Sequence, residues 1–101
     1  MIHEAIQAVA DAIVQQCSPL KIYLVSEKRD ITQSLVSFKL ALIVPADAGN
    51  ISELECMLYA NIDSDYPYDL VLYKITEWET LRSDNRTFAW KIEQTGSVLY
   101  E

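Results

Sequence analysis

The fold of this chain is decided by residues 37–44, which read Ser-Phe-Lys-Leu-Ala-Leu-Ile-Val and are followed by Pro45. Successive side chains of a β-strand point to opposite faces of the sheet. One face of this segment would therefore carry Phe38, Leu40, Leu42 and Val44, and the other would carry Ser37, Lys39, Ala41 and Ile43. The alternation predicts a strand whose second face is polar at its start and apolar at its end.

Other strands are predicted on both sides of this segment. Residues 21–26 are apolar on both faces of a two-residue period, which is typical of a strand in the interior of a sheet. Residues 69–73 alternate in the same way after the turn signal of Pro67. The polar residues 27–33 are expected to form a loop or one short helical turn, and residues 97–100 a last short strand or an extended tail.

Helices are predicted where apolar residues recur at helical spacing. The first stripe is Ile2, Ile6, Val9 and Ile13, in a helix that ends before Pro19. A second helix should begin after Asn50, an N-cap residue with Glu53 three positions later. Two shorter helices are expected at residues 77–82 and 85–94, closing at Gly96. Strands and helices alternate without repeats or linkers, so we expect a single α/β (α+β) domain over residues 1–101.

The charge of the chain argues against several classes of partner. Its 101 residues carry a formal net charge of −7, which repels nucleic acid and anionic membranes. The longest apolar runs, such as residues 40–44, fall far short of the roughly 20 residues that cross a bilayer. The first residues carry no basic start of the kind found in signal peptides. We therefore expect a cytoplasmic protein that binds neither nucleic acid nor membrane.

Several segments taken together resemble the minimal nucleotidyltransferases, the small proteins of the DNA polymerase β-like superfamily. These segments are residues 22–30, the strand 37–44, Tyr-Asp-Leu-Val at 68–71, and residues 92–101, which end in Val-Leu-Tyr-Glu. Members of that family carry a Gly-Ser turn after the first strand, an Asp-x-Asp on the second and a third Asp on the next. The resemblance places Ser26 in the turn, Ser37 and Lys39 at the Asp-x-Asp, and Asp69 at the third aspartate. It implies a mixed sheet of three to four strands flanked by helices.

The departures from the family pattern bear on catalysis. Two-metal nucleotidyl transfer needs carboxylates at i and i+2 of one strand and a third on its neighbour. Of these the chain keeps only Asp69, while Lys39 carries a positive charge that repels cations. Val25 also stands in place of the turn glycine that lets phosphates approach the backbone. We expect a degenerate site without metal, cofactor or ATP–Mg²⁺ binding, and we hypothesise an ion pair between Lys39 and Asp69, with a solvent-exposed Lys39 as the alternative.

Aromatic residues crowd the second half of the chain and offer an interface. Phe88 lies four residues before Ile92 and is expected to face the core. The candidates for a partner surface are Tyr66, Tyr68, Trp78 and Trp90, of which Trp90 lies off that stripe and the two tyrosines lie in or next to a turn. The nearby Asp63 and Asp65 are interpreted as a solvated turn.

Three functions follow from these observations. The favoured one is a catalytically inactive module that binds or regulates a protein partner or pairs with a second copy. The resemblance adds the small all-helical partners of two-component, toxin–antitoxin-like systems. One alternative is an active nucleotidyl- or adenylyltransferase that uses Asp30, Asp47 or Asp65 as substitute metal ligands. The other is a nucleotide sensor without turnover, with an anion site at Ser26, Lys28 and Arg29.

Overall fold

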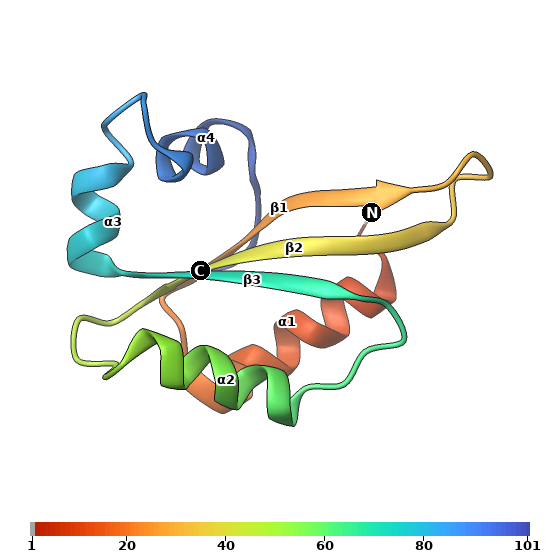
Figure 1. The fold of residues 1–101 in the computed structure, drawn as a ribbon, viewed down its shortest axis with the longest axis horizontal. Helices are drawn as coiled ribbons and strands as arrows, with labels where there is room; N and C mark the ends of the chain where they lie inside the picture. Colours follow the sequence, from red (N-terminus) through yellow and green to blue (C-terminus); the bar gives the residue numbers. More distant parts are fainter. Residues whose placement is uncertain (1) are drawn as a thin grey trace.

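The computed structural model describes residues 2–101 and shows a four-stranded mixed sheet with helices on both sides (Figure 1). The elements in chain order are α1 (Glu4–Cys17), β1 (Lys21–Arg29), β2 (Leu35–Val44), α2 (Ile51–Asn61), β3 (Tyr68–Lys74), α3 (Ile75–Leu81), α4 (Phe88–Thr95) and β4 (Ser97–Tyr100). The predicted fold class and the flanking helices are confirmed.

The strand order across the sheet is β3-β2-β1-β4. β1 runs antiparallel to both β2 and β4, whereas β2 and β3 are parallel. The two apolar strands β1 and β2 are therefore the inner strands, as the apolar pattern of residues 21–26 predicts. The parallel pair is connected by α2, because parallel neighbours need a crossover connection.

Two hydrophobic clusters fill the two sides of the sheet. α1 and α2 cover one side, where Ile6, Ile13, Leu40, Leu42 and Leu58 are completely buried. Burying one such side chain contributes about 1.5–3 kcal/mol. α3 and α4 lie on the other side and bury a smaller cluster of Tyr23, Ala41, Ile43, Trp78, Ala89 and Ile92. The two faces of residues 37–44 thus meet different helices, as their alternation predicts.

The loop predicted at residues 27–33 is only partly present, because β1 continues through the first three of these residues. Glu27, Lys28 and Arg29 extend β1, and the chain turns only at residues 30–34 to form a hairpin with β2. Asp30 closes this turn, since one of its carboxylate oxygens accepts hydrogen bonds from the backbone N–H groups of Thr32 and Ser34. Short polar residues such as Asp fold back on their own backbone in this way, so the turn is confined to a few residues and the strand continues up to it.

The predicted helix boundaries are partly confirmed. The Asn50 side chain caps α2 by accepting a hydrogen bond from the Glu53 N–H at 3.0 Å. α4 begins at Phe88 instead of residue 85, because the Thr87 hydroxyl caps it by accepting from the Trp90 N–H at 3.2 Å. Gly96 does end α4, but in an extended conformation. Within residues 2–101 no helix has the length and apolar character to span a membrane.

Candidate functional site

The candidate site lies on the part of the sheet that α3 and α4 do not cover. These two helices pack over the Ala41 and Ile43 end of β2 and leave the end nearest the β1–β2 turn without a helix (Figure 1). Ser37 and Lys39 lie on this open stretch and are half-buried, and Asp69 is exposed. The polar start and apolar end of this strand face therefore decide where the helices pack and where the sheet stays open.

The strand register brings the four positions named by the resemblance together. Lys39 pairs with Asp69 across β2 and β3, and Ser26 pairs with Lys39 across β1 and β2. Ser37 precedes Lys39 by two residues and so shares its face. Ser26, Ser37, Lys39 and Asp69 line one open depression of about 420 Å³, together with Glu27, Lys28 and Phe38.

The turn expected at Ser26 is not formed. Ser26 lies inside β1, next to a bulge between Leu24 and Ser26, and its ladder partner is Lys39. A phosphate-binding turn presents several free backbone N–H groups to one anion. A strand residue inside a ladder does not provide that arrangement, so the expectation of a turn at Ser26 is wrong.

The hypothesised ion pair between Lys39 and Asp69 is also not formed. The two residues are direct neighbours in register, but among residues 2–101 none of the ion pairs of 4.0 Å or less involves either of them. The Lys39 Nζ lies 5.4 Å from the centre of the Phe88 ring instead. The Lys39 side chain is directed toward α4, where an aromatic face attracts its charge, while Asp69 stays in solvent.

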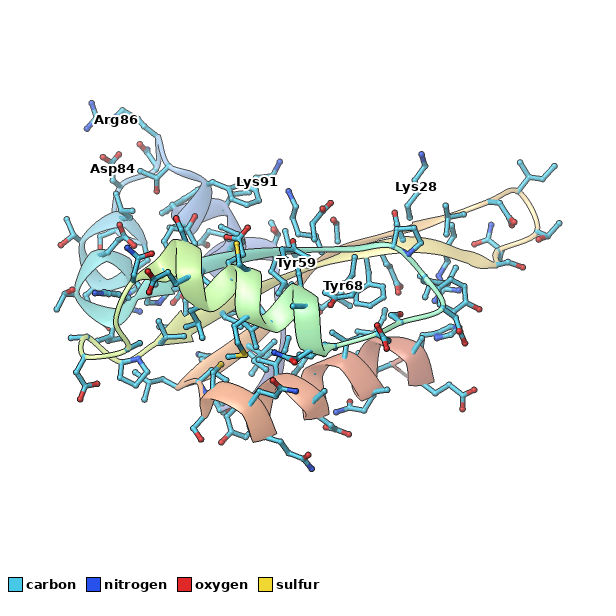
Figure 2. The ribbon with its side chains drawn as sticks, turned by 60° about the horizontal axis from the view of Figure 1, so that its bottom comes forward. Lys28, Tyr59, Tyr68, Asp84, Arg86 and Lys91 are labelled. Atoms are coloured by element: carbon cyan, nitrogen blue, oxygen red, sulfur yellow. The ribbon has the colours of Figure 1, made fainter. Side chains whose placement is uncertain are left out.

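A second depression, between α4 and the sheet, adjoins the first. It has a volume of about 240 Å³ and shares Ser26 and Lys39 with the larger one. Its remaining lining residues are Val25, Phe88, Lys91, Ile92 and Thr95. We call the two depressions together the lysine cleft, after Lys28, Lys39 and Lys91. Lys28 and Lys91 extend on the side of the sheet opposite α1 (Figure 2).

The lysines of this cleft differ from most cationic residues of the chain. Of the eight lysines and arginines, four form ion pairs: Lys21 with Glu101, Arg29 with Glu27, Arg82 with Glu79 and Glu93, and Arg86 with Asp84. The other four are Lys28, Lys39, Lys74 and Lys91. Three of these four line the cleft. Within residues 2–101, most of the positive charge without an ion-pair partner thus lies at one place on a strongly acidic chain.

The acidic residues considered as substitute metal ligands lie apart. Asp30 is in the β1–β2 turn, Asp47 follows β2, and Asp65 lies between α2 and β3 in a depression lined by α1 residues. Within residues 2–101 no three His, Cys, Asp or Glu side chains gather in a group that could hold a metal ion. None of these three aspartates lines the lysine cleft.

Two of the aromatic predictions are corrected by the structure. Trp78 is only 3% exposed and packs between Tyr23 and Tyr73, so it belongs to the core and not to an open surface. Phe88, expected in the core, is 41% exposed. It is the first residue of α4, at the edge of the covered part of the sheet. A residue at the start of a short helix can extend beyond the surface that the helix covers, and helical periodicity alone does not take this into account.

The remaining aromatic candidates are half-buried. Tyr68 stacks on Phe38 and Tyr59, and its hydroxyl donates to the Ile62 carbonyl at 2.6 Å. Tyr66 packs edge to face against the ring of His3, and Trp90 is half-buried on α4. Tyr66 and Tyr68 both pack against the α1–α2 cluster. Their partner-binding role stays a prediction, and they do not line the lysine cleft.

Comparison of the chain with protein-family models, with curated proteins and with solved structures gives no match. The functional assignment therefore rests on the residues and geometry described above.

Proposed function

We propose that this protein is a catalytically inactive domain of nucleotidyltransferase-like design that serves as a protein-interaction or regulatory module. The observation that carries the proposal is the pairing of Lys39 with Asp69 on the open sheet face, with Ser37 two residues before Lys39. In the family that the sequence resembles, the corresponding positions would carry the three carboxylates of the two-metal site.

The chemistry of this arrangement disfavours a metal. A divalent cation about 5 Å from an ammonium group is repelled by about 2 kcal/mol even at the dielectric constant of water. Ser37 adds only a neutral oxygen, and Asp69 alone supplies one of the several oxygen ligands that Mg²⁺ requires. The site is thus better suited to binding negatively charged groups than metal ions.

A nucleotide sensor without turnover is the second candidate. The observation that favours it is the group of unpaired lysines, Lys28, Lys39 and Lys91, which line the cleft together with Ser26. The exposed Asp69 carboxylate in the same cleft and the strand conformation of Ser26 weigh against it. Arg29, expected to share an anion site, instead pairs with Glu27 at 3.3 Å.

Titration with ATP, with and without Mg²⁺, tests these functions. A ligand that binds only the folded state raises the melting temperature. We expect no saturable stabilisation and no transfer of radiolabel from a nucleoside triphosphate. Mg²⁺-dependent stabilisation with label transfer would establish an enzyme and refute the proposal. Saturable binding of ATP without Mg²⁺ and without transfer would favour the sensor.

The nature of the partner is part of the proposal. A protein partner and a second copy are both compatible with an interaction module, and a two-component, toxin–antitoxin-like pair is the form that the family resemblance suggests. Light scattering during size-exclusion chromatography distinguishes a monomer from a dimer. A dimer that persists on dilution would assign the interaction to self-association.

A further inference from the structure

We propose that the lysine cleft binds an acidic segment of a partner protein. Carboxylates of that segment would lie on Lys28, Lys39 and Lys91, and one of its apolar side chains would enter the depression beside Phe88. The inference rests on the proposed function, since it names the surface and the partner chemistry of the interaction module.

Local charge is the first argument. Exposed charges are screened over about 8 Å at physiological ionic strength, so a bound segment responds to the cleft more than to the net charge of −7. Three unpaired lysines line the cleft. Of its two carboxylates, Glu27 pairs with Arg29, which leaves Asp69. The cleft is therefore locally cationic on an acidic protein, and it complements a negatively charged segment.

Spacing is the second argument. Lys28 lies opposite Ser37, two residues from Lys39 along β2. Diagonal neighbours of this kind on adjacent antiparallel strands are about 7–8 Å apart. Residues i and i+2 of an extended peptide are separated by about 7 Å and point to the same side. Two acidic residues with one residue between them thus match Lys28 and Lys39.

The smaller depression is the third argument, because it can receive the apolar side chain of the partner segment. Phe88 is 41% exposed and lines it with Val25 and Ile92, and Lys39 and Lys91 line the same depression. Its volume is about 240 Å³. A depression of this size suits one side chain of a partner, and an apolar pocket edged by charge is typical of the centre of a protein interface.

The same features disfavour a phosphate ligand. A triphosphate concentrates several negative charges within a few ångströms, and here Asp69 lies among the lysines. Nucleic acid is longer than the cleft and would meet the acidic remainder of the surface. A peptide places its carboxylates singly and leaves neutral backbone between them.

Binding of synthetic peptides tests the inference. The probes are fluorescent 12-residue peptides in which two or three Asp or Glu residues at i, i+2 spacing flank one Leu or Phe, and matched peptides with Asn or Gln. Fluorescence polarisation of the full chain should show saturable binding of acidic probes only. Lys39→Gln/Lys91→Gln should weaken it at least tenfold. Lys74→Gln removes the fourth unpaired lysine, outside the cleft, and should change it less than twofold.

Several outcomes would overturn the inference. One is equal binding of the acidic and neutral probes. Another is an equal loss of affinity in Lys74→Gln and in Lys39→Gln/Lys91→Gln. The third is that no acidic probe binds at a site whose affinity changes in Lys39→Gln/Lys91→Gln. Displacement of a bound probe by inorganic triphosphate at constant ionic strength, with triphosphate itself binding more tightly, would reassign the cleft to phosphate. A dimer abolished by Lys39→Gln/Lys91→Gln would make the occupant a second copy. If no acidic probe binds and ATP–Mg²⁺ is also inert, only this inference fails.

Discussion

Placing carboxylates at Ser37 and Lys39, where the proposed nucleotidyltransferase-like design would have metal ligands, tests the geometry of the site directly. In the double variant Ser37→Asp/Lys39→Asp, two new carboxylates would share a sheet face with Asp69, because Lys39 and Asp69 are in register and Ser37 lies two residues before Lys39. Neighbouring strands are about 4.8 Å apart and alternate residues about 7 Å apart. Three carboxylates at these spacings can reach one or two divalent ions.

The expected change in the unfolding free energy of this double variant follows from the repulsion between its carboxylates. At the dielectric constant of water, two carboxylates about 5 Å apart repel each other by about 0.8 kcal/mol, and two about 7 Å apart by about 0.6 kcal/mol. With salt screening we expect the metal-free variant to lose roughly 1–2 kcal/mol of unfolding free energy. An ion present at 100 times its Kd returns about 2.7 kcal/mol. For a domain of about 100 residues this is a rise in melting temperature of roughly 10–20 °C.

The assay is thermal unfolding, followed by circular dichroism, with and without Mn²⁺ or Mg²⁺. The wild type and the neutral variant Ser37→Asn/Lys39→Asn should show little response to the ions. Adding Asp69→Asn to the double variant should remove most of the metal-dependent rise. If the double and triple variants respond equally, the three side chains do not converge, and the argument that Ser37 and Lys39 replace metal ligands is refuted.

Three further predictions concern the fold around the site. Tyr59→Phe removes the hydroxyl that accepts from the Leu70 N–H on the edge strand β3 at 2.7 Å. It should cost about 1–3 kcal/mol in chemical denaturation and speed amide exchange at Leu70; unchanged exchange there would contradict this. Gly96→Ala should destabilise by about 1–3 kcal/mol, because its Cβ would lie 2.7 Å from the Ile92 carbonyl oxygen, and equal or higher stability would show that α4 gives way. Hydrogen bonds, chiefly from the Thr32 side chain, lower the pKa of Asp30 below its ordinary 3.8. Because the folded pKa is depressed, its contribution is complete above about pH 4 and is lost as the pH falls through the folded value. The melting-temperature advantage over Asp30→Asn should shrink only in that acidic range, and a constant difference would count against the assignment.

Local patterns predicted several elements well. The alternation in residues 37–44 correctly assigned each side chain of β2 to one of two faces, since the two-residue period is a property of the strand itself. The Asn50 cap was equally readable, because capping depends on residues only three positions apart. Residues 27–29 were misread, since their polar side chains look like a loop, although the hairpin ladder holds them in β1.

The candidate site was only partly accessible from sequence. The resemblance selected Ser26, Ser37, Lys39 and Asp69, and the structure does bring them to one depression. It gave no indication of Lys91 or Phe88, which come from α4 and reach the same cleft only through its packing on the sheet. Trp78, expected on the surface, is buried, and Phe88, expected in the core, is exposed. Helical spacing does not predict how far a helix extends over a sheet.

By itself, the sequence determined most of the secondary elements, the two faces of the central strand, and that Ser37 and Lys39 are not carboxylates. Tertiary structure alone decided that Lys39 is directed toward Phe88 instead of pairing with Asp69, and that three unpaired lysines line one cleft. The reason is physical. Periodicity and capping are set by neighbours along the chain, whereas register, helix coverage and side-chain direction depend on packing between segments far apart in sequence.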